Sequence, residues 1–376
     1  MEFRIERSAW TDAVAWAARV LPTRSLVPVL GGLLLEAADG RLRVSGLDDE
    51  ASARIEVEAE TIRAGKALVV GRRLLDVCRV LPEGVVECGV EGSRFSLTSG
   101  SARFGLSVLP FDDYPALPAL PEVLGAVEAE EFAAAVAHVT VAAGRDDTLP
   151  ALTGIRLALD GDTMTLAATD RYRFAVRTLP WKPGKGDISA DVVVSARRLA
   201  ETARSFGRGG MVRLALDDSS AGFELAGMRT TVRLLDSRLP RHDKLFAMAD
   251  PVRAVVERAP LVEAVKRVAV VAEGGSPLRL TFSEASLLLR AGYGDDVASQ
   301  RLPAALGGVD ELTVAFNPAY LMDALASFDA PVVRFDLLGP GQRAMVTGWG
   351  SEEDATRDAA HPAHQHLLMS VKPSAR

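Results

Sequence analysis

The sequence predicts an α+β fold made of three tandem copies of one domain, each with two helices backed by antiparallel sheets. Two observations predict it. An apolar helix pattern recurs near the start of each third, and a strand-to-helix pattern follows about 60 residues later. Short alternating segments separated by turn residues lie between these helices, which is typical of antiparallel strands. We expect domains at residues 1–121, 122–249 and 250–376.

The first repeated pattern is an apolar stripe at positions i, i+3, i+4 and i+7. Its members are Trp10, Ala13, Val14 and Ala17 in the first copy, Phe132, Ala135, Val136 and Val139 in the second, and Leu261, Ala264, Val265 and Val268 in the third. This spacing places four apolar side chains on one helix face in every copy. We therefore expect all three helices to pack against a core.

The second repeated pattern begins as a β-rich strand and continues as a helix. Leu74, Leu199 and Leu321 hold equivalent places in it, 125 and 122 residues apart. In the third copy Asn317 precedes Pro318, which is typical of a helix start, because the asparagine caps free N–H groups and the proline needs none. A repeat of this length indicates whole domains in tandem, and two such chains with complementary ends can close into a ring.

Composition limits the classes of protein to which the chain can belong. Its 376 residues, 48% hydrophobic and 25% charged, are typical of a globular protein of two or three domains. No apolar run reaches the length of a membrane span, and no signal peptide is evident, so we expect a cytoplasmic protein.

Cys78 and Cys88 are expected as buried thiols. The net charge of −7 argues against a surface that grips nucleic acid all over, but it leaves a local basic patch open.

Arginines recur on the second helix of the first two copies. Arg72 and Arg73 are matched by Arg197 and Arg198, and the pattern places all four on an exposed face. Such charge is usually no more than a solvated surface. The same pair of arginines recurs at the same structural place in two copies of an acidic protein, which favours a contact with the phosphates of a nucleic acid. Contacts with phosphates do not depend on the base sequence, so they would allow the protein to slide along the nucleic acid. Further cationic candidates are Arg24 and Arg145, with ordinary surface arginines as the alternative.

The sequence shows no constellation for catalysis or metal binding. His361, His364 and His366 lie in a polar stretch that favours a flexible loop over a metal site. His138 and His242 are isolated and have no evident acid or nucleophile beside them. There is no phosphate-binding glycine loop, dinucleotide fingerprint, nucleophile elbow or zinc-protease motif. We expect no enzyme activity, no metal and no cofactor.

Five segments carry a resemblance to a known family: LVPVLGGLLLEA, GRDDTLPALTG, AATDRYRFAVR, FNPAYLMDAL and the closing HLLMSVK. Together they resemble the bacterial DNA polymerase III β subunit, the sliding clamp, through all three copies. The resemblance implies three DNA-clamp domains per chain and a head-to-tail homodimer that forms a six-domain ring. It also implies that helices line a pore around double-stranded DNA. A protein of this kind is a processivity factor held by topology, not an enzyme.

The resemblance also implies three sets of contact residues. Those facing DNA are expected to be Arg24, Arg72, Arg73, Arg145, Arg197 and Arg198. Those closing the ring are expected to be Phe104, Leu106, Val270 and Val271, with an internal core as the alternative. Those lining a pocket for short linear peptides of the polymerase, the clamp loader and repair factors are expected to be Leu152, Thr169, Arg171, Tyr172, Arg173, Phe174, Pro240, Leu245, Tyr320, Met345, Leu367, Met369, Ser370 and Val371. An apolar groove with a few polar groups suits an extended peptide with leucine and phenylalanine anchors.

The chain departs from the family pattern at this pocket. Ser370 stands where a proline is usual, and Phe174 stands where leucine is common. Unlike proline, Ser370 has a backbone N–H and a φ angle that is not fixed by a ring, and Phe174 has a larger side chain than leucine. The stretch 352–365 is long and rich in histidine. We therefore hypothesise a variant clamp, a second copy whose altered pocket resists an inhibitor of the ordinary clamp.

Two other interpretations stay open on the sequence alone. One is an enzyme with a site in a cleft between domains, although no convergent acid–base set is evident. The other is an interaction scaffold that kept the clamp fold and lost ring closure.

Overall fold

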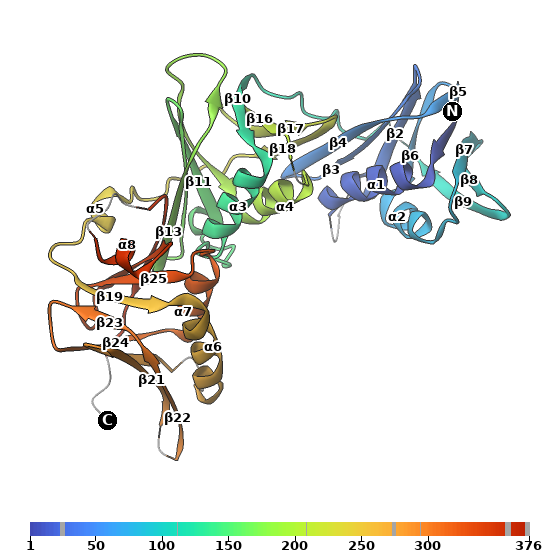
Figure 1. Cartoon of the computed structure of the whole chain (residues 1–376). Coiled ribbons are helices and arrows are strands. Elements are labelled where there is room, and N and C mark those ends of the chain that lie inside the picture. The colour runs from blue at the N-terminus through green and yellow to red at the C-terminus, as the bar shows by residue number, and fades with distance from the viewer. Residues whose placement is uncertain are drawn as a thin grey trace. The chain divides into compact units, whose positions relative to one another are not determined.

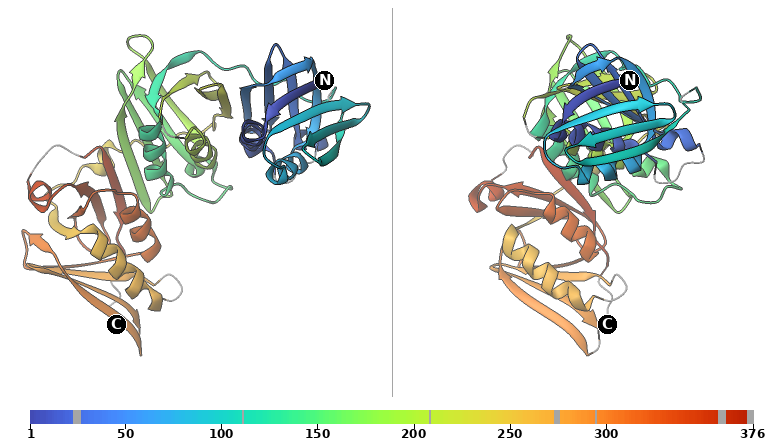
Figure 2. Two further views of the ribbon diagram at one scale, coloured as in Figure 1. Left: turned by 45° about the vertical axis from the view of Figure 1, so that its right-hand side comes forward. Right: turned by 90° about the vertical axis from the view of Figure 1, so that its right-hand side faces the viewer.

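The computed structural model describes residues 1–22, 27–110, 112–207, 209–272, 276–293, 295–357 and 362–372. They form two compact units, which Figures 1 and 2 trace along the chain. The first unit holds Met1–Glu130, Trp181–Gly186 and Glu201–Leu234, and the second holds Glu131–Pro180, Asp187–Ala200 and Leu235–Arg376. The middle third of the sequence is therefore shared between the units. The three-domain bounds at 121 and 249 stay a prediction.

Each third of the described chain contains two helices of nine or more residues. They are α1 (Arg7–Ala17) and α2 (Gly71–Val80), α3 (Ala129–Thr140) and α4 (Ala196–Ser205), and α6 (Arg258–Val268) and α7 (Pro318–Ala326). Shorter turns of helix are η1 (Ala18–Val20), η2 (Pro28–Gly31), η3 (Pro150–Thr153), α5 (Asp243–Phe246), η4 (Ala269–Val271) and α8 (Glu352–Thr356). All twelve residues of the predicted apolar stripes are 2% exposed or less, and Leu74, Leu199 and Leu321 are fully buried. Both repeated helix predictions are confirmed.

Nine strands in each third accompany the helices in the described chain. The first third contains β1 (Glu2–Glu6), β2 (Gly32–Ala38), β3 (Arg41–Leu47), β4 (Ala51–Glu58), β5 (Glu60–Arg63), β6 (Gly65–Val70), β7 (Val85–Glu91), β8 (Arg94–Ser99) and β9 (Ala102–Leu109). The middle third contains β10 (Val123–Glu128), β11 (Gly154–Asp160), β12 (Thr163–Thr169), β13 (Arg173–Pro180), β14 (Lys182–Pro183), β15 (Ser189–Ser195), β16 (Met211–Leu216), β17 (Ser220–Leu225) and β18 (Met228–Arg233). The last third contains β19 (Val252–Glu257), β20 (Leu278–Ser283), β21 (Ser286–Tyr293), β22 (Asp296–Pro303), β23 (Ala305–Gly307), β24 (Glu311–Phe316), β25 (Val332–Leu337), β26 (Arg343–Trp349) and β27 (His364–Met369).

The first unit is built on one antiparallel sheet of 14 strands. Its order is β14-β10-β16-β17-β18-β4-β3-β2-β6-β9-β8-β7-β1-β5. The sheet passes from the middle third to the first third where β18 pairs with β4, with Thr230 opposite Ala53. Helices α1 and α2 pack beside each other on this unit, and Trp10 of α1 meets Phe3 with ring centres 5.8 Å apart.

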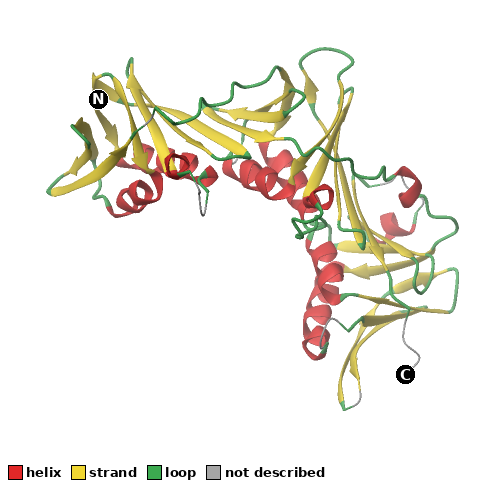
Figure 3. Cartoon of the chain, turned by 180° about the vertical axis from the view of Figure 1, so that it is seen from behind, coloured by secondary structure: helices red, strands yellow, loops and turns green. Residues whose placement is uncertain are grey.

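The second unit contains a sheet of nine strands and a sheet of four. The larger has the order β15-β11-β12-β13-β27-β26-β25-β19-β23, and the smaller has the order β22-β21-β20-β24. The larger sheet passes from the middle third to the last third where β13 pairs with β27, with Phe174 opposite Leu367. Helices α6 and α7 lie along one side of the last third's strands, where Figure 3 shows them in red. The β13–β27 junction lies beneath the candidate site.

The two cysteines are buried, free thiols, as predicted. Burial raises the pKa of the Cys78 thiol to about 12 and that of Cys88 well above its ordinary value. Both sulfurs therefore stay protonated near neutral pH and are poor nucleophiles. No helix among the described residues is long and apolar enough to cross a membrane.

The structure corrects the predictions for Arg198 and for the histidine-rich stretch. Arg198, expected on an exposed face, is only 8% exposed, because it lies one turn before Thr202 on the buried side of α4. The histidine-rich stretch was expected to form a loop, but His364 and His366 lie in β27 and are 5% and 0% exposed. Pairing with β13 and β26, which are distant in sequence, makes this polar segment a central strand. His361 lies outside the described residues.

Candidate functional site

An open pocket of about 620 Å³ lies beside the junction of β13 and β27. Its walls come from η3 and the segment before it, from the turn between β12 and β13 with the first residue of β13, and from the first turns of α7. The lining residues are Ala143, Gly144, Arg145, Asp146, Leu149, Leu152, Asp170, Arg171, Tyr172, Arg173, Ala319, Tyr320 and Asp323. We call this space the polar half of the site.

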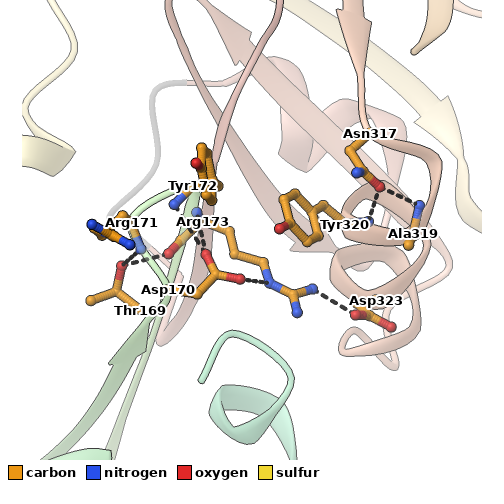
Figure 4. Close-up of polar contacts among 9 residues, drawn as sticks. All are labelled: Thr169, Asp170, Arg171, Tyr172, Arg173, Asn317, Ala319, Tyr320 and Asp323. Atoms are coloured by element: carbon orange, nitrogen blue, oxygen red, sulfur yellow. Dashed lines mark hydrogen bonds and ion pairs between the residues drawn. The ribbon is translucent and has the colours of Figure 1, made fainter. Parts of the chain in front are cut away.

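A buried arginine organises the polar half. The side chain of Arg173 is 6% exposed; its Nε lies 2.9 Å from Asp170 Oδ2 and its Nη1 lies 2.6 Å from Asp323 Oδ2. The guanidinium also lies over the Tyr320 ring, 4.4 Å from its centre, as Figure 4 shows. Because a buried charge is costly without partners, these contacts fix Arg173 and connect β13 of the middle third to α7 of the last third.

The turn before β13 is held by side-chain contacts to its own backbone. Asp170 Oδ1 accepts from the N–H groups of Tyr172 (3.0 Å) and Arg173 (3.1 Å). The Thr169 hydroxyl donates to the Arg173 carbonyl at 2.7 Å and accepts from the Arg171 N–H at 3.1 Å. Arg171 has φ of 81°, a conformation that favours glycine. The turn therefore keeps a strained arginine at the pocket wall.

The cap of α7 positions the aromatic wall. Asn317 Oδ1 accepts from the N–H groups of Ala319 (2.9 Å) and Tyr320 (3.3 Å), which confirms the predicted helix start. The Tyr320 ring stacks near that of Tyr172, with centres 6.2 Å apart and planes 26° apart (Figure 4). Burial, followed by the charge of Asp170, raises the pKa of Tyr320. Its hydroxyl therefore stays neutral at physiological pH.

A second, closed cluster continues the site across three neighbouring strands. Phe174 of β13 is paired with Leu367 of β27, which is paired with Met345 of β26. These side chains are 3%, 5% and 3% exposed. Phe246 of α5, 8% exposed, packs on them. Ala167 and Val176 complete this cluster, with Leu245 and Met248 against it. We call it the apolar half of the site.

The closing segment of the chain borders both halves. The Met369 N–H donates to the Tyr172 carbonyl at 2.9 Å, and the Val371 N–H donates to the Ala315 carbonyl at 2.8 Å. The Met369 and Val371 side chains are 40% and 42% exposed. Ser370 points inward: its hydroxyl donates toward the Gln342 carbonyl (2.8 Å) and accepts from the Gln342 N–H (3.0 Å). The serine therefore ties β27 to the turn between β25 and β26.

The structure brings together most of the predicted pocket residues. Leu152, Arg171, Tyr172, Arg173 and Tyr320 line the polar half. Phe174, Leu245, Met345 and Leu367 belong to the apolar half. Thr169 is buried and braces the turn, and Pro240 is exposed in the segment before α5. Their roles in binding stay predictions.

Among the side chains that organise the two halves, Asp170, Asp323 and Phe246 were not predicted from the sequence. Asp170 and Asp323 pair with Arg173, and Phe246 packs on Phe174. The pocket lining contains five further residues that were not predicted: Ala143, Gly144, Asp146, Leu149 and Ala319. The spacing TDRYR, which places an acid three residues before an arginine, was a readable signal for Asp170. No local pattern marked the others, because each meets its partner only through the fold.

The predicted cationic residues fall into different environments. Arg72, Arg73 and Arg197 are exposed on α2 and α4, and Arg72 Nη2 also donates to the Leu21 carbonyl at 3.3 Å. Arg145 is exposed and lines the polar half of the pocket. Arg198 is buried, and Arg24 lies outside the described residues.

The residues predicted to close a ring lie near unpaired strand edges. Phe104 and Leu106 are half-buried on β9, which in the described chain pairs with β6 only at Val108 and Leu109. Val270 of η4 is 82% exposed, whereas Val271 packs partly against the core of the last third. The η4 turn contacts β22, which is an edge strand of the four-stranded sheet in the described chain.

The histidines are not isolated, contrary to the sequence prediction. His138 stacks on His364 with ring centres 4.9 Å apart, and His364 Nε2 lies 2.9 Å from the Ser327 hydroxyl. Burial, followed by the charge of His138, lowers the pKa of His364 to about 3, and burial also lowers the pKa of His366 well below its ordinary value. Among the described residues no group of three or more histidines, cysteines or carboxylates is arranged to hold a metal.

Comparison with protein families matches the chain in three consecutive parts. Residues 1–118 match the N-terminal domain of the DNA polymerase III beta subunit, residues 126–241 its central domain, and residues 245–358 its C-terminal domain.

Individual relatives match over nearly the whole chain. The beta sliding clamp of Streptomyces coelicolor is 48% identical over 380 residues, covering 100% of both chains. The beta sliding clamp homolog GriR of Streptomyces muensis is 40% identical over 375 residues, covering 99% of both. In fold, a crystal structure of the Pseudomonas aeruginosa sliding clamp bound to griselimycin superposes with a TM-score of 0.89 at 24% identity, covering 99% of this chain and 100% of that one.

Proposed function

The chain belongs to the family of bacterial DNA polymerase III β subunits, the β sliding clamps, and on this premise we propose that two copies close head to tail into a ring around duplex DNA. The match of all three family domains along the chain carries the assignment. In the described chain, the side of β9 that faces β6 is open before Val108, and β22 is an edge strand; both support closure by strand pairing, because an open edge presents N–H and C=O groups to another strand. The exposed side chain of Val270 supplies an apolar contact beside such an edge.

In this proposal the protein holds DNA by topology and catalyses no reaction. Arg72, Arg73 and Arg197 are exposed on the second helices of the first two copies and contact phosphates of any sequence. The net charge of −7 keeps the rest of the protein from gripping DNA, so the ring slides. As a replication factor it works in the cytoplasm.

The site at the β13–β27 junction captures short linear peptides of the polymerase, the clamp loader and repair factors. The polar half offers aromatic walls and an arginine network, and the apolar half offers a hydrophobic floor. This combination suits an extended peptide with apolar anchors and a few polar groups.

A loading assay on DNA tests the ring. The chain is loaded by its clamp loader on nicked circular DNA, and the complex is separated from free protein by gel filtration. We expect retention on the circle that is lost when the DNA is linearised, because a ring slides off an end. Retention on linear DNA that weakens only with salt would instead indicate ordinary electrostatic binding.

Light scattering separates the ring from an interaction scaffold of the same fold. We expect the mass of a dimer at micromolar concentration. A triple variant, Phe104→Asp, Leu106→Asp and Val270→Asp, is expected to elute as a folded monomer and to lose retention on circles. A wild-type protein that is monomeric at working concentration would favour the scaffold.

We further propose that the chain is an accessory clamp that resists a pocket-directed inhibitor. Phe174 fills the apolar half, and Ser370 replaces the usual proline with a hydroxyl bonded to the Gln342 turn. The likeness to the beta sliding clamp homolog GriR of Streptomyces muensis supports a second-copy role. Side-by-side titration of griselimycin against this chain and the S. coelicolor clamp tests it. We expect weaker binding here, and equal affinities would refute resistance at the pocket.

A further inference from the structure

The helix α7, which contributes Tyr320 and Asp323 to the polar half, is also held at its other end. Ser327 is the C-terminal cap of α7, and its hydroxyl lies 2.9 Å from Nε2 of His364 on β27. His364 Nδ1 donates to the Val176 carbonyl of β13 at 3.1 Å. His364 therefore connects the end of α7 to the two strands that pair beneath the site.

The ring of His364 is neutral and adopts one tautomer. Burial keeps it uncharged at physiological pH, because burial lowers the pKa of His364 to about 3. A carbonyl only accepts, so the proton lies on Nδ1, and Nε2 accepts from the Ser327 hydroxyl. The same hydroxyl lies 2.7 Å from the Ala324 carbonyl, one turn earlier in α7. The contact between β27 and α7 is therefore directional, and it is buried, with His364 5% and Ser327 4% exposed.

Two further rings pack against His364. His138 of α3 stacks on it, with ring centres 4.9 Å apart and planes 24° apart, and the Phe328 ring centre lies 4.5 Å from it. His138 Nε2 also lies 3.5 Å from Oδ2 of Asp329, in the segment after α7. The chain that follows α3 contributes residues 143–149 to the wall of the polar half. The cluster around His364 therefore fastens α3, α7 and β27 to one another at one place.

We propose that His364 is a positioning residue of the polar half: through Ser327 it fixes α7, and hence the Tyr320 ring, without touching the ligand. This inference rests on the proposed function of the site as a peptide pocket. Neither His364 nor Ser327 belongs to the lining of the pocket of about 620 Å³. The ion pair of Arg173 with Asp323 holds the middle of α7, and His364 holds its end. Without the second contact α7 pivots about the first, and the Tyr320 ring leaves its place in the wall.

The tyrosines of the chain give a readout of this position that needs no ligand. The sequence has four of them, Tyr172 and Tyr320 in the polar half and Tyr114 and Tyr293 elsewhere. The protein is labelled with fluorotyrosine, and its fluorine NMR signals are assigned with the variants Tyr172→Phe and Tyr320→Phe. The signals of Tyr114 and Tyr293 then serve as internal references.

Two variants remove the contact of His364 in different ways. His364→Phe keeps a ring of similar size but lacks both nitrogens, whereas Ser327→Ala leaves β27 unchanged. Each variant is expected to shift the Tyr320 signal and to leave the Tyr114 and Tyr293 signals in place. Ser327 lies about 10 Å along the helix from Tyr320, so a shift reports movement of α7 and not a direct effect of the substitution. A Tyr320 signal that stays in place in both variants would overturn the proposal.

A truncation elsewhere in the core of the last third is the matched control. Leu287→Ala removes a fully buried side chain of β21 and is expected to destabilise the protein at least as much as Ser327→Ala does. It is expected to leave the Tyr320 signal in place, because β21 belongs to the four-stranded sheet and not to the strands that hold the end of α7. A shift as large as that of Ser327→Ala would show that any loss of stability moves Tyr320, and would overturn a specific role of His364.

Peptide affinity connects the position of Tyr320 to binding. We measure, by anisotropy, the binding of a fluorescein-labelled synthetic peptide with one leucine and one phenylalanine anchor. His364→Phe and Ser327→Ala are each expected to weaken binding about fivefold, the factor that one neutral hydrogen bond represents. The double variant is expected to bind no more weakly than either single variant, because both substitutions break the same contact.

The outcomes separate the positioning role from the proposed pocket. If the wild type binds the peptide and both variants bind it equally well, only the positioning role is refuted. If the wild type does not bind the peptide, the proposed pocket is refuted, and the fluorine signals still decide whether His364 positions α7.

Discussion

The two halves of the site lie side by side on the β13–β27 junction but are stabilised by different interactions, ion pairs in one and hydrophobic packing in the other. The polar half is an open space organised by one buried guanidinium between two carboxylates, and the apolar half is a closed cluster of hydrophobic rings and chains. Ion pairs fix the positions of the charged side chains but leave space between them. Dispersion and hydrophobic burial are most favourable when side chains fill all the space. The open half is therefore accessible to a ligand, whereas the closed half is filled by its own side chains.

The largest effect on stability is expected from the buried arginine. Arg173→Met leaves Asp170 and Asp323 without their shared partner, and removing one member of a buried ion pair costs about 3–5 kcal/mol. Urea unfolding measures the loss. Arg145→Met, on an exposed arginine of the same pocket, is expected to change stability little. Equal effects of the two variants would show that the network contributes no more than a surface charge.

A pH dependence is expected from the opposite face of β27. His364 has an ordinary pKa of about 6.5 when unfolded and about 3 when folded. The unfolded chain therefore binds a proton between these values and the folded chain does not. The contribution of this group is complete above pH 6.5 and is lost as pH falls toward 3, by about 3 kcal/mol at pH 4. Urea unfolding at pH 7 and pH 4 tests this, and His364→Gln should reduce the pH dependence without abolishing it, because burial also lowers the pKa of His366.

A core truncation in the apolar half is expected to follow in size. Leu367→Ala removes a side chain that is 5% exposed between Phe174 and Met345, and such changes cost about 2–3 kcal/mol when neighbours relax. Thermal or urea unfolding reports the loss. Leu367→Met, which keeps the volume, is the matched control with a smaller effect. A nearly neutral Leu367→Ala would show that the apolar half is loosely packed.

The smallest effect is expected at Ser370. Ser370→Ala removes the acceptor of the Gln342 N–H and a donor to its carbonyl, for a loss of about 1 kcal/mol. Ser370→Thr keeps the hydroxyl and should lose less. Peptide affinity measured on the same variants shows whether the Gln342 turn affects the site: a change with Ala but not with Thr assigns that effect to the hydroxyl.

Local patterns predicted most of the framework and part of the site. The apolar stripes of α1, α3 and α6, and the Asn317 cap, were readable because each depends on residues within one or two turns of each other. The exposure of Arg198 and the loop around His364 were mispredicted for the opposite reason. Arg198 lies on the buried side of α4, although its charge favours solvent. β27 forms a strand only because it pairs with β13 and β26, which lie far away in sequence.

The sequence by itself determined the repeat, the helix faces, the family and the residue types of the pocket, because periodicity and motif are properties of neighbouring residues. Only the tertiary structure decided that Arg173 is neutralised by Asp323 and that Phe246 covers Phe174. Residues 150 and 72 positions apart form these contacts, and chain connectivity alone does not specify which distant side chains meet. The site therefore owes its chemistry to the sequence and its open and closed halves to the packing around one strand junction.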